Sequence, residues 1–388
     1  MKQHPVTQLI RTRVDKTQEG EHSSPLFLTS SFCFDSAEEM RAAFADETDA
    51  NIYSRFSNPN VKEFVDRMCI LEGAEDGFAT ASGMSAVFAT FMTHLKQGDH
   101  LISCNAIFGS THTVITKYLT RYGIEYTYVP ANDRQKWEAA IRPNTKMLFL
   151  ETPTNPGLEI VDLEMVNAVA KKHGLIYVVD NCFATPIGQR PIEFGADLVI
   201  HSATKWIDGQ GRTLGGVVVG KSALIHDIYL FCRSTGPAMS PFNAWLLSKS
   251  LETLEVRMER HVQTAYYLSQ SLENHPKISW LKYPFLPSHP QYEIAKKQMK
   301  NGGALLSFEL KGGLEAGRKF LDNLQILSLT ANLGDTKSIA SHPASTTHAK
   351  LSNEERLIAG ITPGMIRISA GLENQEDILN DVLQALNK

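Results

Sequence analysis

The sequence predicts an α/β protein, in which helices flank a mostly parallel sheet and a smaller α+β domain follows. Short apolar runs alternate with amphipathic patterns between residues 77 and 220. This spacing is typical of βαβ units and therefore of a parallel sheet. Beyond about residue 270 the alternation stops, and strand-like runs at 304–312 and 364–374 indicate a mixed domain.

The first strand candidate, GFATA at 77–81, runs into SGMSAVFATFMTHL at 82–95, where apolar residues recur at i, i+3, i+4 and i+7. That periodicity predicts an amphipathic helix. The next helix candidates are STHTVITKYLTRYG and DLEMVNAVAKKHG, and a long helix is expected through Leu246, Leu247, Leu251, Leu254 and Met258. The further strand candidates of this region are 100–104, 125–130, 146–151, 175–180, 196–203 and 214–220.

Residues 1–60 are polar and turn-rich, so this segment cannot bury a core of its own. It must pack on another part of the chain or on a second subunit. The sequence therefore predicts an N-terminal arm at 1–60, an α/β domain at 61–250 and an α+β domain at 251–388.

Composition argues against several classes of protein. The net charge of −4 lacks the basic excess of a nucleic-acid binder. The five cysteines are widely spaced without a C-x-x-C pair, and His342 and His348 do not have the spacing of zinc ligands, so we expect neither disulfides nor a metal site. The N-terminus lacks the apolar core of a signal peptide and no apolar run is long enough to span a bilayer, so we expect a cytoplasmic protein without a membrane partner.

Lys205 raises the functional question, because a lysine that follows a buried strand needs a partner or a chemical role. It stands in HSATKWIDGQGRTLGG, directly after Ser202 and Thr204. Asp180 ends the preceding strand candidate, LIYVVD. Since ligands bind at the carboxyl ends of parallel strands, we expect these side chains to lie together.

A third strand end adds a place for a phosphate. Gly83 and Met84 begin the helix after GFATA, and a helix N-terminus offers backbone N–H groups to an anion. An amine, an acid and a phosphate site together match pyridoxal phosphate, which needs a lysine for its Schiff base and an acid at its pyridine nitrogen. Each feature alone also fits an ordinary cap, turn or solvated side chain. The GQGRTLGG stretch does not have the G-x-G-x-x-G spacing of a dinucleotide site, and no helix pattern follows it.

Six motifs extend the argument over nearly the whole chain: YSRFSNPN, ATASGMSAV, ETPTNP, VVDNCFATP, HSATK and RISAGLEN. With them the chain resembles the Cys/Met-metabolism branch of the fold-type I pyridoxal-phosphate enzymes, which includes cystathionine γ-synthases, cystathionine lyases and methionine γ-lyases. The resemblance implies a transferase with a seven-stranded sheet, bound pyridoxal 5′-phosphate and a homo-oligomer, a dimer at least and a tetramer by analogy, with shared active sites.

For the cofactor, the resemblance implies that Lys205 forms the Schiff base and that Asp180 pairs with the pyridine nitrogen. It implies that Gly83, Met84, Ser202 and Thr204 hold the phosphate, together with Tyr53 and Arg55 from the neighbouring subunit. Many relatives carry a stacking tyrosine where this chain has Phe108, which can stack on the ring but cannot transfer a proton.

For the substrate, the resemblance implies that Arg367 binds the α-carboxylate, with Asn155 and Asn332 close to the site. The stretches STGPAMSPFNAW, LPSHPQYEIAKKQM and NLGDTKS are similar to those of the O-succinylhomoserine sulfhydrylases within this family. That similarity implies γ-replacement on O-succinylhomoserine with sulfide, an activity of methionine biosynthesis. Synthase or lyase activity on the same scaffold, and binding of the cofactor without catalysis, remain alternatives. Acetyl instead of succinyl as the leaving group, cysteine instead of sulfide as the nucleophile, and the role of Arg212, which replaces an acidic residue of several lyases, also remain open.

Overall fold

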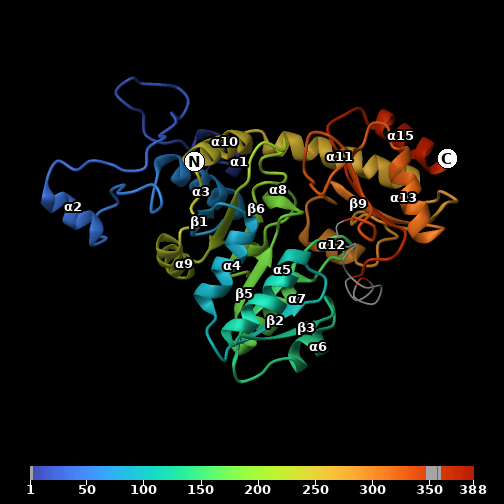
Figure 1. Cartoon of the computed structure of the whole chain (residues 1–388), viewed down its shortest axis with the longest axis horizontal. Coiled ribbons are helices and arrows are strands. Elements are labelled where there is room, and N and C mark those ends of the chain that lie inside the picture. The colour runs from blue at the N-terminus through green and yellow to red at the C-terminus, as the bar shows by residue number, and fades with distance from the viewer. Residues whose placement is uncertain (1–2, 347–355, 357–359) are drawn as a thin grey trace.

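The computed structural model of the chain describes residues 3–346, 356 and 360–388. Two sheets, each with its own core, lie side by side along the long axis of the molecule (Figure 1). The larger sheet has the strand order β1-β7-β6-β5-β4-β2-β3. Its strands are β1 Asp76–Thr80, β2 His100–Cys104, β3 Glu125–Val129, β4 Thr145–Glu151, β5 Ile176–Asp180, β6 Leu198–Ser202 and β7 Gly216–Gly220.

This sheet is mostly parallel, as the sequence predicts. Strands β6, β5, β4, β2 and β3 run parallel, whereas β7 is antiparallel to both β1 and β6. The carboxyl ends of β1, β6, β5 and β4 therefore meet at one edge. Its helices are α3 Pro59–Glu72, α4 Gly83–His94, α5 Gly109–Thr113, α6 Arg134–Ala139, α7 Leu163–His173, α8 Thr185–Gly188 and α9 Ser222–Thr235.

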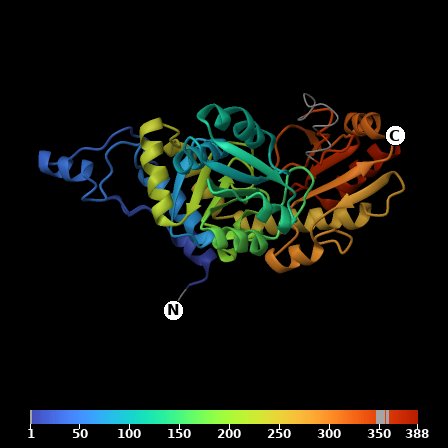
Figure 2. The ribbon, with the colours of Figure 1, turned by 90° about the horizontal axis from the view of Figure 1, so that it is seen from below.

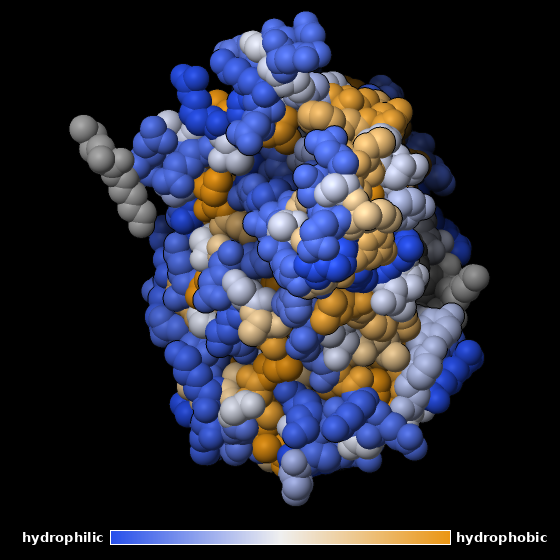
Figure 3. Space-filling view, turned by 90° about the vertical axis from the view of Figure 1, so that its left-hand side faces the viewer, coloured by the Kyte–Doolittle hydropathy of each residue, from blue (hydrophilic) through white to orange (hydrophobic). Residues whose placement is uncertain are grey.

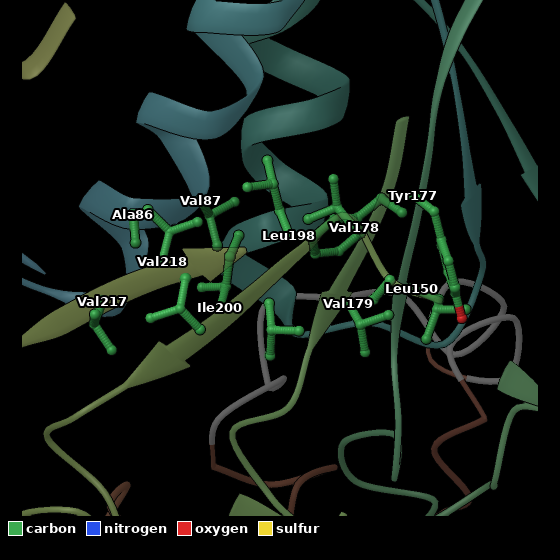
Figure 4. Close-up of a cluster of buried hydrophobic side chains, with 14 of the residues drawn as sticks. Ala86, Val87, Leu150, Tyr177, Val178, Val179, Leu198, Ile200, Val217 and Val218 are labelled. Carbon is green, nitrogen blue, oxygen red and sulfur yellow. The ribbon is translucent and has the colours of Figure 1, made fainter. Parts of the chain in front are cut away.

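Apolar side chains fix α4 against the centre of the sheet. Ala86 and Val87 on α4 face Val218 on β7, next to Ile200 on β6, whereas Val217 points to the opposite face of the sheet (Figure 4). All five are at most 1% exposed. Burying a valine or isoleucine side chain stabilises the fold by about 1.5–3 kcal/mol, so this packing holds the first turn of α4 at the carboxyl edge of the sheet.

The second sheet has the order β10-β11-β12-β9-β8 and is antiparallel except between β10 and β11. Its strands are β8 Ile278–Lys282, β9 Leu305–Leu310, β10 Ser328–Leu329, β11 Ile339–Ser341 and β12 Met365–Ser369. The helices of this part are α11 Leu254–Leu272, α12 Tyr292–Gln298, α13 Gly313–Asn323 and α15 Gln375–Asn387. Leu268, Phe308, Phe320, Ile366 and Val382 belong to its separate apolar core.

The long helix expected through Leu246 to Met258 is wrong: the chain forms α10 Pro241–Leu251 and α11 with a turn between them. The carbonyl of Ser250 accepts hydrogen bonds from Arg257 Nη2 (3.0 Å) and from the Thr253 hydroxyl (3.2 Å). That carbonyl is drawn out of the helical pattern, which ends α10. Residues 109–122 are also less regular than expected, because α5 continues as a π-turn and a 3₁₀ turn.

The N-terminal segment contains α1 Pro5–Arg11 and α2 Ala37–Phe44. The part that carries α2 projects away from the sheets in both ribbon views (Figures 1 and 2). Its exposed apolar side chains include Leu26, Leu28, Met40, Phe44 and Tyr53, and Figure 3 shows apolar patches on the face at this end of the molecule. The boundaries at residues 60 and 250 stay a prediction. No helix in the described residues is both long enough and apolar enough to cross a membrane.

Candidate active site

The candidate site lies at the carboxyl edge of the large sheet, where it meets the second sheet. Lys205 follows β6 and points to the loop before β11: its Nζ donates a hydrogen bond to Asn332 Oδ1 (2.7 Å). Burial lowers the pKa of Lys205 below its usual value, and the positive charge of Arg367 lowers it further. A lysine with a lowered pKa gives up its proton more easily than a solvent-exposed lysine, which is what a proton-accepting role requires.

Arg367 is 6% exposed and reaches the same asparagine from β12. Its Nη1 donates to Asn155 Oδ1 (2.9 Å) and its Nη2 donates to the carbonyl of Asn332 (3.3 Å). Its Nε is buried without a hydrogen-bond partner among the described residues. Burial lowers the pKa of Arg367 to about 10, which still leaves it charged at neutral pH. A buried guanidinium with an unused N–H suits a planar carboxylate ligand.

Two carboxyl groups stand next to each other at the ends of neighbouring strands, since Glu151 on β4 is paired in register with Asp180 on β5. Burial, and then the charge of Asp180, raise the pKa of Glu151 well above its usual value. Burial raises the pKa of Asp180 only to about 6, because the backbone N–H of Cys182 and then the nearby His201 favour its charged form. At neutral pH the negative charge of the pair therefore belongs to Asp180.

Glu151 is a residue that sequence reasoning did not select. Its Oε2 accepts a hydrogen bond from the backbone N–H of Phe108 (2.7 Å), and it lies near Arg367. It thereby holds the segment of Phe108 and acts on Arg367 only through its charge at a distance. The available signal was its place at the end of an apolar strand, the same signal that selected Asp180.

The start of α4 forms a cradle against Ser202. A Cβ on Gly83 would lie 2.6 Å from the Cβ of Ser202, so only glycine permits this approach. The N-cap residue Ser82 accepts from the backbone N–H of Ser85 (3.2 Å), and the preceding N–H groups of the first turn have no partner among the residues that the structure describes, so they can bind an anion. Met84 lies in the same turn, where Thr111 donates to its sulfur (3.8 Å).

Thr204 and Phe108 are the remaining residues of the same chain predicted to contact the cofactor. Thr204 accepts a hydrogen bond from the backbone N–H of Gly215 (3.1 Å) and lines the same cavity as Lys205. Phe108 as a whole residue is 41% exposed, although its backbone N–H donates to the carboxylate of Glu151.

The structure does not bring Tyr53 and Arg55 to Lys205 of the same chain. Arg55 lies over the rings of Phe56 (4.9 Å) and Tyr53 (5.5 Å) and donates to the carbonyl of Arg233. The two ring contacts lie within the N-terminal segment, and the bond to Arg233 joins this segment to α9 of the same chain. Of the two histidines excluded as metal ligands, His342 bonds Ser345 and the carbonyl of Pro363, and His348 lies outside the described residues. The described part of the chain contains no cluster of His, Cys, Asp or Glu that could hold a metal ion.

Comparison with known proteins agrees with this geometry. The model of the family "Cys/Met metabolism PLP-dependent enzyme" matches residues 6–387. The chain belongs to this family. It is therefore a pyridoxal-phosphate enzyme of the transferase type, and the cradle at Gly83, the acid Asp180 and the partly buried Lys205 fit that cofactor.

An O-succinylhomoserine sulfhydrylase of Pseudomonas aeruginosa is 47% identical over 98% of this chain and 94% of its own. An L-methionine γ-lyase of Porphyromonas gingivalis is 44% identical over 94% of this chain and 92% of its own. A solved structure from Campylobacter jejuni, provisionally assigned as an O-acetylhomoserine (thiol)-lyase, has a TM-score of 0.95 and 34% identity, and it covers 99% of this chain and 100% of its own. That protein carries N′-pyridoxyl-lysine-5′-monophosphate at its position 205.

Replacing Asp180 by Asn should stabilise the cofactor-free protein at pH 7.5 and should abolish most of the activity. The pKa of Asp180 rises on folding to about 6, so the folded state favours the protonated carboxyl group. This contribution to stability is fully present below the unfolded pKa and is lost as the pH rises through 6, where the buried group must become charged. Removing the charge should therefore raise the free energy of unfolding at pH 7.5 by about 1–3 kcal/mol. Denaturant unfolding at pH 7.5 and at pH 4 measures this, and the gain should disappear at pH 4.

Activity supplies the second half of this test. The amide keeps the shape of the side chain but cannot balance a positive pyridine nitrogen, so turnover of the cofactor-loaded variant should fall by more than about tenfold. Full turnover of Asp180→Asn would contradict the pairing of Asp180 with the pyridine nitrogen. An equal change in the free energy of unfolding at pH 7.5 and pH 4 would contradict the raised pKa.

Proposed function

We propose that the enzyme catalyses γ-replacement on O-succinyl-L-homoserine, in which sulfide displaces succinate and gives L-homocysteine. The Cγ–O bond breaks, succinate leaves with the bonding electrons, and sulfide supplies the new Cγ–S bond. The observation that carries the proposal is the hydrogen-bonded line from Lys205 through Asn332 to Arg367. It places a proton acceptor beside a site for a carboxylate, as an amino-acid substrate requires.

The chain's own residues divide the work. When bound, pyridoxal phosphate supplies the electron sink that makes the α-proton of an amino acid acidic. Asp180 holds the negative charge that a protonated pyridine nitrogen needs. Arg367 orients the substrate through its α-carboxylate, and Lys205, with its lowered pKa, accepts and returns protons at the α and β carbons.

One relative supports succinyl as the acyl group and sulfide as the nucleophile: it is 47% identical and is named O-succinylhomoserine sulfhydrylase. The γ-lyase at 44% identity supports γ-elimination as a second candidate. Phe108 favours replacement, because it has no hydroxyl with which to transfer protons beside the cofactor.

A steady-state assay tests the proposal directly. The purified enzyme is offered O-succinyl- and O-acetylhomoserine, each with sulfide or with cysteine. We expect the highest kcat/KM for the succinyl ester with sulfide, with homocysteine and succinate in equal amounts. Formation of 2-oxobutanoate and ammonia from methionine at a higher kcat/KM would identify a lyase instead, and cystathionine as the main product would identify a synthase.

Arg367→Lys should weaken both acyl substrates by a similar factor, because the α-carboxylate is common to them. Arg367→Ala should lower kcat/KM by at least about thirtyfold, since a buried charge pair loses one partner. The absorbance of the bound cofactor should stay normal in both variants and serves as the control. Loss of activity on the succinyl ester alone would place Arg367 on the acyl group rather than on the α-carboxylate.

We also propose that Tyr53 and Arg55 complete the phosphate site of a neighbouring subunit in a homo-oligomer. The segment that carries them projects from its own chain and exposes apolar side chains, which supports an interface there. Inactive Arg55→Ala and Lys205→Ala proteins, mixed under conditions of subunit exchange, should regain activity because one hybrid site is intact. Arg41→Ala, on the same segment, should be active alone. Verified exchange without any recovery would contradict a shared site.

A further inference from the structure

A cavity of 430 Å³ opens beside Lys205, and no part of the substrate has been assigned to its far side, which the loops of Arg212 and Thr330 line. Its lining includes Lys205 and Asn332 from the site and Arg212, Leu214 and Thr330 from the surrounding loops. Arg367 is not among the described residues that line it. A substrate held by Arg367 at its α-carboxylate and by Lys205 at its α-carbon can extend its γ-substituent into this space.

The charge of the cavity is of one sign. Lys205 and Arg212 are the charged side chains among its described lining residues, and no carboxylate is among them. Asp208 forms an ion pair with Arg212 (2.9 Å) but is fully buried and does not line the cavity, so the groups that face the cavity favour an anion, chiefly through Arg212. O-Succinylhomoserine carries a second carboxylate at the far end of its acyl group, whereas O-acetylhomoserine has none.

Arg212 is held in place but is not fully used. Its Nε donates to Asp208 Oδ1 (3.0 Å), its Nη2 donates to Ser250 Oγ (2.5 Å), and Asp208 is fully buried. Its Nη1 has no hydrogen-bond partner in the described part of the chain, and the side chain is 33% exposed. The anchored guanidinium thus keeps the two N–H donors of Nη1 for a ligand without the entropy cost of ordering a free arginine.

We propose that Arg212 binds the distal carboxylate of a dicarboxylic acyl group and thereby selects succinyl over acetyl esters. This inference rests on the proposed γ-replacement function. It assigns the two arginines different substrate groups: Arg367 takes the carboxylate common to all amino acids, and Arg212 takes the carboxylate that only the succinyl ester has. The competing explanation is that Arg212 only braces its loop through Asp208 and Ser250.

Arg212→Gln, Arg212→Lys and a control, Arg142→Gln, are compared on both esters with sulfide. Arg142 is an exposed arginine paired with Glu125, near the start of β4 at the opposite edge of the sheet. We expect Arg212→Gln to lose at least about thirtyfold in kcat/KM on the succinyl ester, mostly through KM, and less than about threefold on the acetyl ester. Arg212→Lys keeps the charge and should lose less on the succinyl ester, again with the acetyl ester nearly unchanged. The control should match the wild type on both.

Inhibition by free succinate distinguishes the two explanations. If Arg212 only held its loop in place, replacing it would not specifically weaken the binding of succinate. With the acetyl ester as substrate, succinate should inhibit the wild type competitively, and Arg212→Gln should raise its inhibition constant by at least about tenfold. Equal losses on the two esters, or unchanged kinetics on both, would overturn the assignment while leaving γ-replacement intact. If the wild type turned over neither ester, the proposed function and this inference would fail together. Should Arg212→Gln not fold, as judged by circular dichroism, the Arg212→Lys comparison decides by the same criteria.

Discussion

A partly buried lysine and a buried arginine that share one asparagine determine how this site is built. Lys205 Nζ bonds the side-chain oxygen of Asn332, and Arg367 bonds its backbone carbonyl. Neither cation has a carboxylate partner within salt-bridge distance among the described residues. Burying two like charges close together is unfavourable, and the lysine responds by giving up its proton more easily. The desolvation that disfavours a charged Lys205 in the folded state therefore also lowers its pKa and prepares it to accept a proton from the substrate.

The arrangement also requires that the two sheets pack closely. Lys205 follows a strand of the large sheet, whereas Asn332 and Arg367 belong to the smaller one. The loop of Asn332 lies directly on the chain after Lys205: a Cβ on Gly334 would lie 2.6 Å from the backbone nitrogen of Trp206. Arg257, on α11, holds the same stretch by donating to the carbonyls of Trp206 (2.7 Å) and Ile207 (3.1 Å). The proton acceptor and the carboxylate site are therefore brought together by contacts between distant parts of the chain.

This division explains what could be predicted from the sequence. Strand periodicity and polar strand ends selected Asp180, Ser202 and Lys205, because adjacency on one sheet edge follows from βαβ order. No local pattern connects Asn155, Asn332 and Arg367, which come from three separate segments, and only resemblance to a family brought them into the site. The turn between α10 and α11 was missed because it depends on Arg257 drawing the Ser250 carbonyl aside. The pairing of Glu72 with His201 (2.5 Å), which supports the strand that ends next to Lys205, likewise joins residues far apart in the sequence.

The most direct test of this account is to find which lysine carries the cofactor. Borohydride reduction of the purified enzyme, followed by proteolysis and mass spectrometry, identifies the modified residue. The account predicts that the pyridoxyl group is found on Lys205, and that Lys205→Ala protein, loaded with cofactor and reduced in the same way, has no stoichiometric label. A reduced adduct on a different lysine of the wild-type protein would contradict the site as built here.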